Sequence, residues 1–161
     1  MDLDPRLHFV TATAVVARKD ADGALRFLIA KRAPTEKAFP NKWTLPGGKL
    51  VRSEYESIPY STAFPQWRNM MDWLVRKETL EEVNVEVEDI TYLTDLVFVR
   101  PDGYPVVTFS FWCMYKSGDA KPGKDLTEVA WITAEEAAKY DMIDGIPEEI
   151  MATAKIIGLS K

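Results

Sequence analysis

Short runs of apolar and β-branched residues, separated by turn sequences, occupy most of the chain. Runs rich in valine, threonine and aromatic residues are typical of β-strands, and two pairs of them are joined by sequences that contain Asp-Gly. Glycine after aspartate accepts positive φ, so these sequences, at residues 20–23 and 100–103, predict two hairpins. The predicted strands cover residues 9–17, 25–30, 92–99, 106–115 and 129–132.

Helical signals appear in the last part of the chain. Thr133 and Glu136 have the spacing of a capping box, which predicts a helix over about residues 134–140. Pro147 suits the first position of a second helix, and Gly158 suits its end. The apolar face of this second helix would consist of Ile150, Ala154 and Ile157.

The order of these elements predicts the fold class. One helix interrupts the strands near the middle of the chain and two helices follow them. This order is typical of an α/β (α+β) domain in which a mixed β-sheet lies between helices. The chain has no internal repeat, low-complexity tract or interdomain linker. We therefore expect residues 1–161 to form a single domain.

The composition supports a globular protein and narrows its partners. Hydrophobic residues make up 47% of the chain and aromatic residues 11%, which is enough for a core. The formal net charge of −5 repels nucleic acid and polyphosphate at long range. An anionic ligand would therefore need local cations or a metal ion, and nucleic acid is not expected as a partner.

A single cysteine and a single histidine limit the possible sites. Cys113 excludes an internal disulfide, and it lies among strand aromatics, where we expect a small core residue. His8 precedes the first strand, and we expect a structural or exposed role for it. Zinc sites, and serine or cysteine triads, therefore have almost no support in this sequence.

The first residues have neither the basic start nor the apolar run of a signal peptide. No uninterrupted apolar stretch approaches the roughly 20 residues of a membrane-spanning helix. We therefore expect a cytoplasmic protein without a membrane partner.

Three glutamates near the middle of the chain carry the main chemical signal. Glu78, Glu81 and Glu82 stand at i, i+3 and i+4, which places them on one arc of a helix. Three like charges so close repel one another, and a divalent cation would supply the missing counter-charge. Carboxylates suit Mg²⁺ or Mn²⁺, which pair naturally with phosphate oxygens. The alternative is a solvated acidic helix face.

A glycine-rich segment precedes these glutamates. In Pro46-Gly47-Gly48 the missing side chains let the backbone pass close to a neighbour and offer amide or carbonyl groups to a metal–phosphate complex. By itself, such a segment is also an ordinary turn. Its combination with the three glutamates shifts the interpretation from a solvated helix face towards a metal site.

Together these residues resemble the Nudix box, G-x5-E-x7-R-E-U-x-E-E-x-G-U, in which U is aliphatic. Gly48 and Glu54 match the first third of the box, and Val85 matches its last position. The metal-binding glutamates of the box correspond to Glu78, Glu81 and Glu82. Segments 30–33, 41–49 and 128–131 are similar to the sequences around the box in nucleotide-sanitising, MutT-like members.

The sequence departs from the box in three places. Between Glu54 and Lys77 lie 22 residues where the family has seven, so about 15 residues are inserted, at about 55–71. Lys77 replaces the box arginine, which keeps the charge but loses the planar fork that grips a carboxylate; the neighbouring Arg76 points about 100° away on the helix. Asn84 replaces the closing glycine and is the next-best residue for a left-handed turn.

The resemblance implies the Nudix fold and a Mg²⁺-dependent (or Mn²⁺-dependent) hydrolase. Such an enzyme would cleave a diphosphate linkage in a nucleoside triphosphate, or in a nucleoside diphosphate linked to another group. Metal held by the three glutamates, together with the Gly47 carbonyl, would activate water. Glu81 or Glu82 would act as the general base or position it.

The resemblance also implies further residues of the site. Members of the family recruit a later carboxylate, for which Glu128 is the first candidate and Asp125 the second. Arg32 and Lys49 would supply the positive charge that an acidic protein needs near its small-molecule nucleotide substrate.

Apolar residues recur at helical spacing across the end of the insert. Trp67, Met70, Met71 and Leu74 stand at i, i+3, i+4 and i+7. In a helix unbroken over about residues 66–83 this stripe would lie beside the glutamates, and Trp67 and Met70 would hold a base by stacking. Alternatively the helix breaks near Asp72, or the stripe packs inside the domain or across a homodimer.

Two other functions share the fold. The first is a non-catalytic Nudix-fold module that binds or senses a nucleotide; such regulators usually carry an added DNA-binding domain, for which 161 residues leave no room. The second is an isoprenyl diphosphate isomerase, which needs a catalytic cysteine, and Cys113 is poorly placed for that role. Phosphate release with magnesium would separate an enzyme from a sensor.

Overall fold

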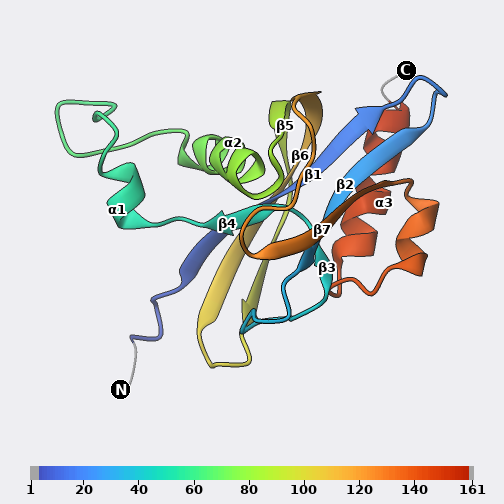
Figure 1. Ribbon diagram of the computed structural model, residues 1–161. Helices are drawn as coiled ribbons and strands as arrows, with labels where there is room; N and C mark the ends of the chain where they lie inside the picture. Colours follow the sequence, from blue (N-terminus) through green and yellow to red (C-terminus); the bar gives the residue numbers. More distant parts are fainter. Residues whose placement is uncertain (1–3, 160–161) are drawn as a thin grey trace.

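The computed structural model describes residues 4–159 and contains a mixed β-sheet with helices on both faces (Figure 1). The strands are β1 (Phe9–Lys19), β2 (Leu25–Arg32), β3 (Trp43–Thr44), β4 (Gly47–Lys49), β5 (Glu86–Val99), β6 (Pro105–Ser117) and β7 (Leu126–Ile132). The helices are α1 (Arg52–Tyr55), α2 (Met70–Val83), the 3₁₀ helix η1 (Glu135–Lys139) and α3 (Ile146–Leu159). The predicted fold class is confirmed. Within the described range no helix has the length and apolar character needed to cross a membrane.

Strand β1 explains the mixed character of the sheet. The strand order is β3-β2-β1-β6-β5, and β1 pairs in parallel with β6 along residues 9–17. It pairs with β2 only at its end, where Ala17 faces Phe27. Along its first half β1 pairs instead with β4, and Gly47 lies opposite Thr13. Because β2 leaves β1 beyond this point, the glycine-rich strand takes the free edge of β1.

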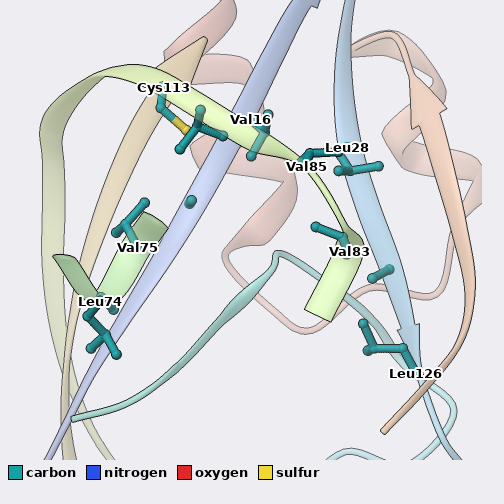
Figure 2. Packing of buried hydrophobic residues seen from close by; sticks show 12 residues of the cluster. Val16, Leu28, Leu74, Val75, Val83, Val85, Cys113 and Leu126 are labelled. Carbon is teal, nitrogen blue, oxygen red and sulfur yellow. The ribbon is translucent and has the colours of Figure 1, made fainter. Parts of the chain in front are cut away.

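Successive residues of β1 point to opposite faces of the sheet and enter two different cores. On one face, Val16 packs with Leu74 and Val83 of α2 (Figure 2). On the other face, Val15 packs with Ile150 of α3. Burying an aliphatic side chain of this kind contributes about 1.5–3 kcal/mol. The two cores therefore hold α2 and α3 firmly against opposite sides of the sheet.

The segment predicted as a helix over residues 134–140 forms the shorter η1, a 3₁₀ helix. The predicted capping box is present, because Thr133 N donates to Glu136 Oε2 at 2.9 Å and Glu136 N donates to Thr133 Oγ1 at 3.4 Å. The backbone bond from Ala137 N to Ala134 O spans three residues, as a 3₁₀ helix requires. The predicted capping box is therefore confirmed, but it begins a short 3₁₀ helix and not an α-helix.

The helix expected over residues 66–83 begins at Met70, so the prediction of an unbroken helix is wrong. Asn69 has φ 58°, a left-handed conformation that α-helices do not continue through. The later part of the apolar stripe packs inside the domain, since Met71 and Leu74 both contact the core beneath α2. Of the alternatives for this stripe, packing within the domain is therefore the one found for these two residues.

Trp67 lies outside α2 and packs within the insert. Its indole Nε1 donates to the Ile58 carbonyl at 2.8 Å. Its ring meets Tyr55 and Tyr60 edge-on, at centroid distances of 5.2 and 5.1 Å. The shared helical phase that would have placed Trp67 beside the glutamates is absent, because Trp67 is not helical and two further non-helical residues separate it from α2. The insert forms a loop that projects beyond α1 and α2 (Figure 1).

Replacing Trp67 by alanine should loosen the insert without affecting ligand binding. Each edge-on aromatic pair is worth about 0.5–1.5 kcal/mol, so we expect cleavage within residues 56–69 by a non-specific protease to become at least about fivefold faster. The melting temperature should fall by a few degrees, while KM and the solution mass stay unchanged. Phe64→Ala is the matched control, because that ring is 74% exposed. A higher KM with unaltered proteolysis would contradict this account.

Candidate functional site

Helix α2 presents Glu78, Glu81 and Glu82 to three different environments. Glu78 is 9% exposed, Glu82 is half-buried and Glu81 is exposed. Glu78 and Glu82 lie against β4, on the same face of α2 as the core residues Leu74 and Val75. The predicted arc of three carboxylates is therefore present, but only two of them are withdrawn from solvent.

Lys77 forms the centre of a cluster of carboxylates. Its Nζ lies 3.0 Å from Glu78 Oε1, 2.9 Å from Glu81 Oε2 and 3.2 Å from Glu54 Oε2. Burial alone would lower the pKa of Lys77, but its hydrogen bonds to Glu81 and Glu78 raise that pKa above the ordinary value. The expectation that the glutamates lack a counter-charge without metal is wrong, because this ammonium compensates Glu78 and Glu81.

Glu54 reaches the cluster in spite of the insert. It lies on α1, and the inserted residues leave the fold after this helix and return at Met70. The extra residues therefore extend outward and do not separate Glu54 from Lys77. The planar fork of arginine is not needed here, since the ammonium group reaches three carboxylates from one point.

The substitution Lys77→Met tests how far the Lys77 ammonium group stabilises the neighbouring carboxylates. Three carboxylates would then face one another, so we expect the unfolding free energy in chelator to fall by about 1–3 kcal/mol, discounted for partial exposure. Millimolar magnesium should raise the melting temperature of this variant more than that of the original protein, because a metal ion would replace the lost charge. Lys116→Met, an exposed change on β6, is the control. Equal responses to magnesium in both proteins would contradict the idea that these carboxylates bind metal.

The remaining departure from the box, Asn84, and the arginine next to Lys77 have simple structural outcomes. Asn84 ends α2 with φ 58°, the left-handed turn for which it was expected to substitute for glycine. Arg76 points away from the cluster, as expected, and binds Asp72 and the Val87 carbonyl at 2.8 and 2.7 Å. It therefore does not replace the box arginine.

Each of the two glycines of β4 lies against one glutamate of α2. Gly47 N donates to Glu82 Oε2 at 3.0 Å. A Cβ at Gly48 would overlap the Glu78 carboxyl group. Burial raises the pKa of Glu82 to about 7, although the Gly47 N–H opposes the shift. Burial likewise raises the pKa of Glu78, against the opposing effect of Lys77. A carboxyl group with a pKa near neutrality can take up and release a proton at physiological pH.

A cleft of about 700 Å³ opens beside these glycines, on the face of the sheet that carries α3. Its floor is a row of hydroxyl side chains on β1 and β6, Thr11, Thr13, Thr108 and Ser110. Glu82 and both β4 glycines line one side, and the start of α3 lines another. The volume lies in the range typical of small-molecule sites, about 300–1,000 Å³. The cleft therefore connects Glu82 with an open surface for a ligand.

The predicted substrate contacts divide into two groups. Arg32 and Lys49 both line the cleft, and the Arg32 guanidinium is held by the Ala38 carbonyl at 2.8 Å. Trp67 and Met70 do not line it. The structure therefore does not bring these two residues to the cleft, because α2 begins only at Met70 and Trp67 lies before it.

Neither of the two candidates for a later carboxylate, Glu128 and Asp125, lines the cleft, but Asp125 acts electrostatically on Glu82. Glu128 lies on β7, where its carboxylate pairs with Lys31 Nζ at 2.9 Å, and it does not line the cleft. The negative charge of Asp125, by contrast, acts on Glu82 and contributes to its raised pKa. The pairing of β7 with β2 directs the Glu128 side chain towards Lys31.

Cys113 and His8 lie away from this chemistry, as expected. Cys113 is fully buried, and burial raises the pKa of its thiol to about 12. A thiol of this kind is not a nucleophile or acid near neutral pH, which argues against an isomerase that uses this cysteine. His8 is exposed, and its Nδ1 lies 3.2 Å from the Arg6 carbonyl.

The carboxylates suit a hard divalent cation by their chemistry. All candidate donors are oxygen atoms, which Mg²⁺ and Mn²⁺ prefer, and Gly48 leaves no side chain between the backbone and Glu78. Among residues 4–159, however, no three acidic, histidine or cysteine side chains converge closely enough to form a metal site. Glu78 and Glu81 turn towards Lys77, and Glu82 turns towards Gly47. A bound cation would have to compete with Lys77 for Glu78 and Glu81.

Several cleft residues gave no signal in the sequence. Glu149, Asp95 and Arg100 line the cleft from α3 and from the β5–β6 hairpin. Glu149 stands in the first turn of α3, where an acidic residue is ordinary. Its position next to Ser110 depends on the packing of α3 against the sheet, and no local pattern indicates it.

Comparison with known proteins places the chain among Nudix folds. No family model matches the sequence. A MutT-like protein of Streptomyces ambofaciens is 28% identical over 135 residues, which cover 84% of this chain and 70% of that protein.

Solved structures are similar over nearly the whole chain. The NUDIX domain of Shewanella oneidensis NrtR, complexed with ADP ribose, has a TM-score of 0.73 at 17% identity, over 97% of this chain and 94% of that one. An Ap4A hydrolase of C. elegans in a binary complex has a TM-score of 0.68 at 18% identity, covering 93% and 98%. The MutT protein of Methanosarcina mazei Go1 has a TM-score of 0.66 at 18% identity, covering 95% and 97%. The protein therefore has the Nudix fold that the sequence predicted.

Proposed function

We propose that the protein is a Nudix hydrolase that uses Mg²⁺ or Mn²⁺ to cleave a diphosphate linkage in a nucleoside triphosphate or in a nucleoside diphosphate linked to another group. The observation that carries the proposal is the placement of Glu78 and Glu82 against Gly48 and Gly47, where Glu82 and both glycines line a 700 Å³ cleft. The likeness to a MutT-like protein, and to folds solved with ADP ribose and as Ap4A hydrolases, supports this substrate class.

Glu78, Glu81 and Glu82 would hold the metal, with the Gly47 carbonyl as a further donor and Asp125 as the later carboxylate. When bound, the metal supplies charge stabilisation for the phosphoryl oxygens and lowers the pKa of a bound water. Glu82 is the group best suited to hold or accept a proton, since burial brings its pKa to about 7. Its bond from Gly47 N orients the carboxyl group towards the glycine strand.

Cations along the cleft would bind the substrate phosphates. Arg32, Lys49 and Arg100 line it, so the cleft offers cationic groups to an anionic ligand on a chain whose net charge is −5. Arg32 is preoriented by Ala38 and Glu36, at 2.8 and 2.5 Å. Such fixed donors orient a polyphosphate at little entropic cost.

The alternative function is a nucleotide-binding module that does not hydrolyse its ligand. One observation favours it: Lys77 already satisfies Glu78 and Glu81, so these carboxylates do not require a metal ion. Both functions predict nucleotide binding in the same cleft, and only hydrolysis separates them.

A hydrolysis screen tests the proposal. Nucleoside triphosphates, oxidised nucleotides, ADP-ribose and dinucleoside polyphosphates would each be incubated with the protein and with magnesium or manganese, and phosphate-containing products would be measured. We expect turnover of at least one class in the presence of metal, and none with chelator. Binding of a nucleotide by calorimetry without turnover under either metal would instead support the binding module.

A further inference from the structure

Glu149 is a carboxyl group in the cleft whose bonding is incomplete. It stands in the first turn of α3 and is half-buried. One of its oxygens, Oε1, accepts a hydrogen bond from Ser110 Oγ at 3.2 Å. The other, Oε2, is buried and has no hydrogen-bond partner among the residues that the structure describes. A buried acceptor without a partner destabilises the folded protein, so a ligand that donates a hydrogen bond to this oxygen would gain affinity.

The position of Glu149 relative to the glycine strand suits a nucleotide. Gly47 lies opposite Thr13 on β1, and Thr13 lies opposite Ser110 on β6. Thr13 Oγ1 and Ser110 Oγ are 3.0 Å apart, so the hydroxyl groups form a continuous row that ends at Glu149. Two strand spacings, or about 10 Å, separate Gly47 from Ser110. This span is comparable to that between the 5′-diphosphate and the base edge of a nucleotide.

We propose that Glu149 is the residue that selects the base of the substrate, and that it favours guanine. An ionised carboxyl group only accepts hydrogen bonds, and guanine presents two adjacent donors, N1–H and the N2 amino group. Adenine and the pyrimidines place an acceptor next to their donor on the same edge, and that acceptor would face the carboxylate. The proposal rests on the proposed function only in taking the cleft as the nucleotide site.

Two features allow this contact. The terminal torsion of glutamate has a broad energy minimum, so the carboxyl group can turn to present its second oxygen to a ligand while Ser110 keeps a hold on the first. The hydroxyl row also leaves polar partners for the ribose between the base and the phosphates. Arg32, Lys49 and Arg100 line the cleft for the anionic part.

Equilibrium binding of nucleoside 5′-monophosphates to the full chain in chelator tests the proposal without any hydrolysis. The ligands are the monophosphates of guanosine, inosine, adenosine and purine riboside, compared by calorimetry. Inosine keeps N1–H but lacks the amino group, and purine riboside lacks both donors. We expect guanosine monophosphate to bind about fivefold tighter than the inosine form and at least about thirtyfold tighter than the purine riboside form, as hydrogen bonds to a charged group imply.

The variant Glu149→Gln should reduce the affinity for guanosine monophosphate about 10- to 50-fold and change that for the purine riboside form less than about twofold. Glu148→Gln, one position earlier on the exposed side of α3, should alter neither affinity. Equal affinities of the original protein for guanosine and purine riboside monophosphates would overturn the proposal, as would a preference for adenosine monophosphate or an equal loss for all four ligands in Glu149→Gln.

The outcome is separable from that of the proposed function. A guanine preference in chelator that persists in a protein without hydrolytic activity would support the role of Glu149 and reject the hydrolase. Metal-dependent hydrolysis without any base preference would do the reverse. The comparison of ligands on the original protein keeps the test valid even if the variant fails to fold.

Discussion

Replacing Glu82 by glutamine should lower kcat at least about a hundredfold, which corresponds to roughly 2.7 kcal/mol of barrier. Glutamine keeps the shape of the side chain and an oxygen that can accept the bond from Gly47 N, so the glycine strand should stay in place. What is lost is the negative charge that would hold metal and the group that would accept a proton. The measurement is kcat under saturating metal and substrate.

Stability against pH gives this variant a second readout. In the absence of metal the folded state raises the pKa of Glu82 from 4.5 to about 7, so folding favours the protonated form. The folded protein is therefore most stable with respect to this group below about pH 4.5, where Glu82 is protonated in both the folded and the unfolded state. This contribution to the unfolding free energy is lost as the pH rises to about 7. Glu82→Gln removes this titration, so its melting temperature in chelator should exceed that of the original protein near pH 7.5.

Glu88→Gln serves as the control for both readouts, because it neutralises an exposed carboxylate on β5. It should leave kcat within about twofold and the pH dependence of stability unchanged. An undiminished kcat in Glu82→Gln would show that the Glu82 carboxylate takes no part in the reaction. In that case the hydrolase proposal would lose its main support.

Replacing Gly48 by alanine should abolish most of the activity while costing little stability. The new Cβ would overlap the carboxyl group of Glu78. That group is the end of a flexible side chain and can move away, so we expect an unfolding free energy lower by only about 1 kcal/mol. The displaced carboxylate would no longer face the glycine strand, and kcat should fall about a hundredfold or more.

Alanine substitutions of two other glycines provide comparisons for Gly48→Ala. A Cβ at Gly158, on α3, would meet no atom within 4 Å, so Gly158→Ala should retain full activity and stabilise the helix slightly. A Cβ at Gly47 would overlap the Ala12 carbonyl of the backbone, which cannot move without breaking the β1–β4 pairing. Gly47→Ala should therefore lower stability far more than Gly48→Ala. Normal activity in Gly48→Ala would show that the position of Glu78 does not matter for catalysis.

The features that the sequence determined by itself are those set by residues close together in the chain. Gly23 and Gly103 have φ 81° and 87°, as their Asp-Gly turns predicted. The capping box at Thr133 is formed, and Asn84 ends α2 in a left-handed turn. The spacing of the glutamates placed them on one arc of α2. Each of these follows from backbone sterics or from helix and strand periodicity, which operate over a few residues.

Only the tertiary structure decided which partners these residues have. Gly47 N and Glu82 lie 35 residues apart in sequence, and Ser110 and Glu149 lie 39 apart. Their contacts depend on how β4 fills the edge of β1 and how α3 packs on the sheet, and no periodicity encodes either. The same holds for Lys77, which the sequence marked only as a substitution for arginine.

The insert shows the limit of periodicity most directly. Trp67 and Leu74 have the apolar spacing of one helix, but the left-handed Asn69 lies between them and α2 begins only after it. Trp67 packs instead against Tyr55 and Tyr60 within the insert. A repeating pattern states which residues would share a face if the helix formed. Whether it forms depends on the competing contacts available to the chain, because isolated helical turns are only marginally stable.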